Sequence, residues 1–240
     1  VGLQTGLAKG YTTDQIMGQL QPVVVDTHAI GNPWLNYSVY LNNTILPGVL
    51  QLMIFLVTVF SIGTEIKYST ARQWLQTGGN SLTTSLLGKL LPQTVIFTLV
   101  ALMCCAALYG FNAFPLNSGW MPMISAMILL VLASQAVGVF MIGVLPTLRL
   151  GLSFASLFGM IAFSIVGFSF PVLGMDPTLQ ALSDLFPLRH YFLIYVDQAL
   201  NGRDLFYSWS EYVWLAGFLI LPFLIGKNLK NALLYFKYIP

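Results

Sequence analysis

Five long apolar segments divide the chain, and short polar stretches separate them. They cover residues 45–64, 88–109, 121–145, 152–173 and 211–226, with no charged residue near the middle of any. A bilayer core about 30 Å thick needs roughly 20 apolar residues in a helix. The pattern therefore predicts an all-α integral membrane protein with about five transmembrane helices. Residues 1–44 are polar and turn-rich, which indicates the remainder of an external domain before a transmembrane domain over residues 45–240.

Composition supports this class. Of the 240 residues, 57% are hydrophobic and 8% are charged, whereas a soluble domain has about 25% charged residues. The net charge of +2 gives no reason to expect a nucleic-acid partner. The two cysteines, Cys104 and Cys105, are adjacent within an apolar segment, so we interpret them as buried apolar residues and expect no metal site.

Basic residues gather in the connections that an alternating topology places on one side. That side has a single acid, Glu65, and seven of the ten basic residues: Lys67, Arg72, Lys89, Arg149, Lys227, Lys230 and Lys237. The positive-inside rule makes this side cytoplasmic, which places the C-terminus inside and residues 1–44 outside. An external segment must be translocated, so we expect a sixth, N-terminal helix to be missing before Val1. A cleaved signal peptide is the alternative.

The apolar segments lack the chemistry of several function classes. Ion-coupled carriers usually need ionisable groups near the midplane, and none lies there. The two histidines, His28 and His190, have no metal-ligand spacing. The Gly-Lys pairs at Lys89 and Lys227 lack the earlier Gly and following Ser or Thr of a phosphate-binding P-loop. Energy for any uphill transport would come from a partner.

Weakly polar residues remain as candidates to line a path. The main candidates are Gln93, Thr94, Thr98 and Ser164, and Ser125 and Gln135 are further polar groups inside the spans. Small residues also recur at a spacing of four, in Ser134 with Gly138 and Ala155 with Gly159, which suits close helix packing or a dimer face.

The polar stretch 65–85 predicts a short amphipathic helix joined to a membrane span. Tyr68, Trp74 and Leu75 share one helical face. Gly78 and Gly79 should end this helix. Asn80 or Ser81 can cap the next helix, which enters the membrane through an elbow at Gly88, Lys89 and Pro92. The short helix suits either the lipid interface or a lever docked on a cytoplasmic protein.

Short external helices are expected before the last span. Asp176 can cap one that starts at Pro177. Pro187 should begin another, which Gly202 can end. The second contains Arg189 and is too apolar for water, so we expect it to dip into the outer face of the membrane.

Three motifs together resemble a known family. They are the entry Asn32–Tyr37 with Leu46-Pro47-Gly48, the stretch Ile62–Glu65 through Gly88-Lys89-Leu90-Leu91-Pro92, and the run Phe186–Tyr191 through Ala199–Gly202. In order and spacing they resemble permease subunits of type-2 ABC exporters, in the multidrug-efflux branch. The resemblance implies six helices per subunit and a coupling helix on the cytoplasmic side. The match in the coupling stretch, Glu65–Thr70, lacks the family's usual acids and Gly-Thr pair.

The resulting hypothesis is a transporter subunit, with no catalysis of its own, that moves an amphipathic or drug-like substrate out of the cytoplasm or inner leaflet of the inner (plasma) membrane. Its expected partners are an ABC ATPase that carries the ATP and Mg²⁺, a second permease copy or paralogue, a periplasmic adaptor protein and membrane lipid. Alternatives are an exporter of a lipid-linked glycan, a lipid-modifying membrane enzyme with His190 at its centre, and a scaffold or sensor subunit. The residues expected to couple to the ATPase are Glu65, Lys67, Tyr68, Arg72, Trp74, Leu75 and Gly79, with the elbow residues Gly88, Lys89 and Pro92; those expected in the external helices are Pro187, Arg189, His190 and Tyr191.

Overall fold

A computed structural model describes residues 8–10, 12, 36–167 and 169–235. The chain divides into units 1–35 and 36–240, and the fold below is that of the second unit. Most of the predicted external segment, His28, the residues Asn32–Leu35 of the first motif and Lys237 lie outside the described residues.

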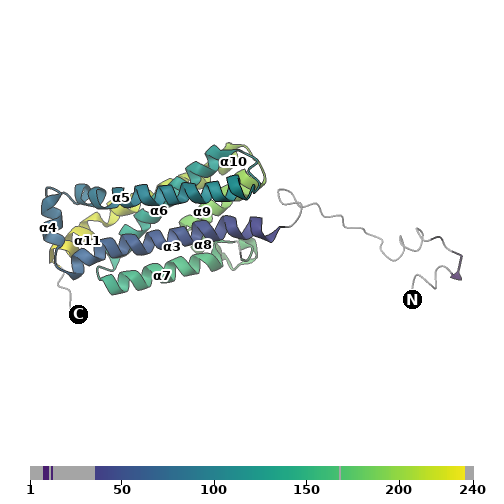
Figure 1. Cartoon of the computed structure of the whole chain (residues 1–240). Coiled ribbons are helices and arrows are strands. Elements are labelled where there is room, and N and C mark those ends of the chain that lie inside the picture. Colours follow the sequence, from purple (N-terminus) through teal and green to yellow (C-terminus); the bar gives the residue numbers. More distant parts are fainter. Residues whose placement is uncertain (1–7, 11, 13–35, 168, 236–240) are drawn as a thin grey trace. The chain divides into compact units, whose positions relative to one another are not determined.

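Five described helices are long and apolar enough to cross a membrane, which confirms the all-α membrane class. They are Tyr37–Lys67 (α3), Leu82–Phe111 (α5 to Cys105, then a π-helical turn), Trp120–Val144 (α6), Leu148–Ile165 (α7) and Leu205–Tyr235. The last consists of α10 (Leu205–Gly217), a 3-10 turn (Phe218–Ile220) and α11 (Leu221–Tyr235). Figure 1 shows these helices running along one bundle, with the short helix α4 (Ala71–Thr77) at one end. No strand occurs in the described part of the chain.

The core forms around α6, which has no charged residue and is buried along much of its length. Helix α3 packs on both α6 and α7, while α5 and α11 also pack on α6. Small residues permit these close approaches. A Cβ atom at Gly138 would lie 2.8 Å from Thr58 Cβ, and one at Gly159 would lie 2.5 Å from Leu52 Cδ1. The small-residue pairs therefore serve helix packing within the chain.

Helix α7 ends at Ile165, although the apolar run continues to residue 173. The backbone of Gly167 has φ of +110°, a conformation that an α-helix does not use. The Arg189 side chain donates Nη1–H to the carbonyl oxygen of Val166 at 2.9 Å, which satisfies a group left free at the helix end. A tertiary contact thus fixes an end that the apolar pattern does not show.

The connection between α7 and α10 contains two short α-helices. Asp176 accepts a hydrogen bond from the N–H of Thr178 at 2.9 Å and caps α8 (Pro177–Ser183), as the sequence predicts. Helix α9 (Pro187–Ile194) also begins at its predicted proline, and a π-helical turn (Tyr195–Leu200) follows it. Leu188 and Tyr191 are fully buried in the helix bundle, so this segment packs against the spans. Its dip into the outer face of the membrane stays a prediction.

Candidate functional site

The polar stretch between α3 and α5 folds into a compact elbow. Helix α4 ends at Thr77, and Gly79 has φ of +67°, a conformation that glycine adopts without strain. At Gly78 a Cβ atom would lie 2.1 Å from Ser85 Oγ, so the turn closes directly onto α5. Ser81 then caps α5 by accepting a hydrogen bond from the N–H of Thr84. The predicted helix end and cap are both confirmed.

A partly buried ion pair fastens this elbow to the neighbouring spans. The ammonium of Lys89 on α5 pairs with the carboxylate of Glu65 on α3, and the Thr70 hydroxyl donates to the same carboxylate. Lys89 Nζ also lies 4.8 Å from the centroid of the Trp74 ring, a distance that suits a cation–π interaction. These residues thus connect α3, α4 and α5 at one point.

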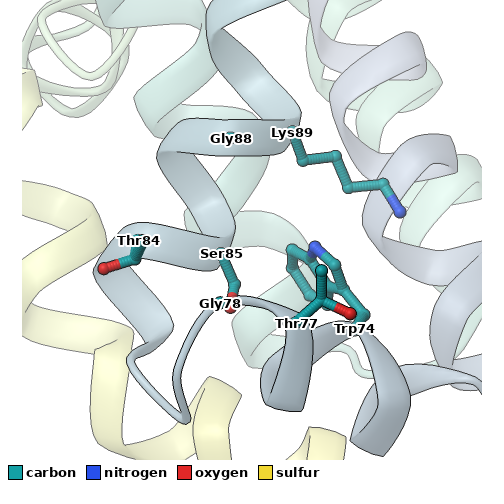
Figure 2. A pocket seen from close by; sticks show the side chains of 7 residues that line it. All are labelled: Trp74, Thr77, Gly78, Thr84, Ser85, Gly88 and Lys89. Carbon is teal, nitrogen blue, oxygen red and sulfur yellow. The ribbon is translucent and has the colours of Figure 1, made fainter.

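A groove of about 460 Å³ opens beside this cluster. Figure 2 shows its lining: Trp74, Thr77, Gly78, Thr84, Ser85, Gly88 and Lys89. A Cβ atom at Gly88 would meet no atom within 4 Å. Helix packing therefore does not require a glycine at this position, and the missing side chain leaves the groove open.

The other predicted coupling residues lie in different environments. Leu75 is buried against its own chain, while Lys67, Tyr68 and Gly79 are exposed. Arg72 donates from Nη2 to the carbonyl oxygen of Leu234, near the end of α11, at 3.0 Å. The same end of the bundle holds a bond from Lys230 to the carbonyl oxygen of Asn80. The last span is thus also tied to the elbow.

The predicted path residues do not all come together. Gln93 donates to Ser61 on α3 at 2.9 Å, and the Thr94 hydroxyl lies 2.7 Å from Gln135 Oε1 on α6. Thr98 is half-buried on α5, the helix that carries Gln93 and Thr94, whereas Ser164 is exposed on α7. In Figure 1, α3 lies between α5 and α7, so the helix that carries Ser164 is apart from the helix that carries the other three residues.

An apolar cavity lies next to Thr94. It has a volume of about 440 Å³ and is bounded by α5, α6 and the last span, with Thr83, Thr94 and Gln135 as its polar side chains. Gln135 stands in a long apolar run of the sequence, and the cavity that it lines emerges only when the helices pack.

The comparison with protein families agrees with this architecture. The model of the ABC-2 family transporter protein matches residues 3–226. The chain belongs to this family. It is a multi-pass membrane permease of an ABC transporter, and membership implies an ABC ATPase partner. Neither a curated protein nor a solved structure matches the chain.

Helix α3 of this ABC-2 permease also carries buried polar side chains, which the apolar pattern of the sequence did not single out. Gln51 and Thr58 are fully buried. Neither the Gln51 amide nor the Thr58 hydroxyl finds a hydrogen-bond partner among the described residues. Buried polar groups usually have a partner, so these two mark polar points on the inner face of a span.

Arg189, His190 and Tyr191 of this ABC-2 permease pack into the bundle. His190 is 1% exposed, and its ring stacks on Trp214 with centroids 5.5 Å apart. Its Nδ1 lies 2.7 Å from Glu211 Oε2, so both residues are occupied with each other. The pKa of Arg189 is lowered, mainly because the guanidinium is partly buried. A buried His190 with its ring atoms engaged is poorly placed to act on a lipid substrate.

Proposed function

We propose that this permease exports an amphipathic molecule from the cytoplasm or inner leaflet, driven by a separate ATPase that docks on α4 and its groove. The observation that carries the proposal is the elbow, which has an open groove and is bonded to α3, α5 and α11. In this proposal the α4 end of the bundle faces the cytoplasm, as the basic residues around it indicate.

The ties around α4 provide a route for movement. The Glu65–Lys89 pair joins α3 to α5, and Arg72 reaches the carbonyl oxygen of Leu234 on α11. A displacement of α4 would therefore act on three spans at once. Rigid-body shifts of packed helices are a common way to change between two states, here inward- and outward-facing packings formed with a second permease copy or paralogue.

The cavity beside Thr94 supports the proposal that the cargo is amphipathic. Its lining is mostly apolar, with the Thr94 hydroxyl and the Gln135 amide among its few polar points. Ligand sites of this kind combine apolar walls with a few polar groups that fix orientation. A molecule with an apolar body and a hydrogen-bonding group fits that lining better than an ion does.

The docking surface can be tested by filling the groove. Gly88→Leu places a side chain in open space, so the fold should tolerate it, and the loss of a helical glycine favours α5 by about 0.5–1 kcal/mol. If the ATPase seats a side chain in the groove, its co-purification with the permease should fall at least about tenfold, which corresponds to about 1.4 kcal/mol. The measurement is ATPase recovered per permease at equal expression.

Gly217→Leu is the matched control. Gly217 also lies in a helix with no atom within 4 Å of its Cβ position, but it is far along the chain from the groove. This variant should recover as much ATPase as the wild type. Full recovery with Gly88→Leu would show that the ATPase docks elsewhere.

A further inference from the structure

Among the contacts between helix α9 and the last span is a buried histidine. The His190 ring packs against the rings of Trp214 and Phe218, with centroids 5.5 Å and 5.9 Å from its own. Both aromatic residues belong to the last span, as does Glu211. The contact lies in the part of the bundle where α9 packs on α10 and α6.

Both ring nitrogens of His190 face oxygen atoms. Nε2 lies 2.9 Å from the backbone carbonyl oxygen of Asp184, and Nδ1 lies 2.7 Å from Glu211 Oε2. A carbonyl oxygen carries no proton, so Nε2–H must be the donor in the first bond. The second bond then needs a proton of its own, because a bare Nδ1 beside an ionised carboxylate would leave two lone pairs facing each other.

The pair therefore holds one shared proton. Either the ring is an imidazolium that donates Nδ1–H to the Glu211 carboxylate, or Glu211 is a carboxylic acid that donates to Nδ1. The first form also suits the stacked Trp214 ring, whose face attracts a cation. In both forms the proton is what joins His190 to Glu211.

The charged groups around the pair come from few elements. Asp184 follows α8, Arg189 precedes His190 on α9, and Glu211 is on α10. Arg189 donates to the Val166 carbonyl oxygen and sits close enough to Asp184 and Glu211 to interact with their charges. Helix α6 has no charged residue, and the charged residues of α3, Glu65 and Lys67, lie in its last turn.

We propose that His190 and Glu211 form a proton-binding latch that fastens α9 to the last span. Loss of the proton removes the bond between Nδ1 and Oε2 and leaves the Nδ1 lone pair facing the Glu211 carboxylate, which is 20% exposed. The charge of Arg189 and the Ser210 hydroxyl, 3.4 Å from Oε1, still act on Glu211, but neither joins it to His190. This end of the bundle then loosens. The latch is independent of the ATPase, the cargo and the direction of transport.

The variant Glu211→Gln keeps a hydrogen bond to His190 Nδ1 but removes the proton that titrates. An amide can donate to a neutral Nδ1 while Nε2–H still donates to the Asp184 carbonyl oxygen, so both bonds survive without a titrating proton. We expect the wild-type melting temperature, relative to this variant, to fall by at least about 3 °C when the pH is raised from about 5 to about 9, because the bond between Nδ1 and Oε2 exists only while the shared proton is present. Raising the pH removes the proton, so stability is present at low pH and is lost as the pH rises.

The full chain in lipid nanodiscs is the sample for these melts. Asp197→Asn is the control, because it removes an ion pair (3.2 Å) whose Arg203 side chain is exposed, and it should leave the wild-type pH slope unchanged. Parallel pH profiles for wild type and Glu211→Gln would overturn the latch.

Nuclear magnetic resonance of the ring nitrogens tests the same point without any change at the latch. The chain has two histidines, so His28→Gln leaves His190 as the single ¹⁵N-histidine signal. We expect Nε2 to carry a proton throughout and Nδ1 to show the shared proton at low pH and lose it as the pH rises. A bare, unbonded Nδ1 at every pH would overturn the proposal, whether or not Glu211→Gln folds.

Discussion

At the scale of single residues, small side chains set the distances between spans. Gly138 on α6 faces Thr58 on α3, and Gly143 on α6 faces Ile225 on α11. In lipid the hydrophobic effect does not drive helices together, so van der Waals contacts between closely packed helices have to stabilise the bundle. The sequence shows the small residues, but it does not show which helix each one faces.

Gly138→Ala should destabilise the bundle. The new methyl group would lie 2.8 Å from Thr58 Cβ, an atom held close to its backbone, so α3 and α6 must move apart. Overpacking of this kind costs about 1–3 kcal/mol, which should lower the melting temperature measured in detergent by several degrees. Gly217→Ala, which meets nothing within 4 Å, should keep or slightly raise it. A melting temperature for Gly138→Ala equal to that of Gly217→Ala would contradict the close contact.

At the scale of elements, local chemistry determines where the short helices begin and end. Asp176, Pro187 and Ser81 each stand where a helix begins, and Gly78 and Gly79 stand where one ends. These positions could be predicted because capping depends on neighbouring residues in the chain. At the end of α7, Gly167 is a local signal that the apolar run hides. The hydrogen bond from Arg189 to Val166 could not be predicted, because Arg189 comes from a different helix.

The cap of α8 should depend on pH. The hydrogen bond from Thr178 lowers the pKa of Asp176 below its usual value. A lowered pKa in the folded state means that the carboxylate stabilises α8 above its unfolded-state pKa, and that this is lost as the pH falls through the folded-state pKa. Hydrogen exchange of α8, corrected for intrinsic rates, should therefore speed up in acid for the wild type. Asp176→Asn retains an uncharged cap and should show no such acid dependence; the same dependence in both would refute the role of the carboxylate.

At the scale of the whole molecule, the bundle has two distinct ends. One holds α4, the start of α7 with Arg149, and the end of α11. The other holds the turn at Asn117, whose amide donates to the Leu200 carbonyl oxygen at 2.7 Å. This arrangement agrees with the alternation of spans, while the side that each end faces rests on charge alone.

Cysteine labelling in intact cells tests the orientation. Gly79, Arg149 and Asn117 are exposed, so a single cysteine at each, in a background without Cys104 and Cys105, should be accessible to reagent. We expect cysteines at Gly79 and Arg149 to react with a membrane-impermeant maleimide only after the cells are opened. The cysteine at Asn117 should react in intact cells. Reaction of Gly79 and Asn117 from the same side would rule out the span between them, and an exchange of the two patterns would invert the orientation.

The sequence by itself determined the membrane class, the five spans, the elbow and the family, because these depend on apolar run length, capping residues and short motifs that stay local in the chain. The tertiary structure decided the rest. Leu75 turns inward, α9 enters the core, and His190 meets Glu211 only because α9 packs on the last span. Each depends on which helix faces which, and a nearly uniform apolar surface carries little pattern from which to infer that pairing.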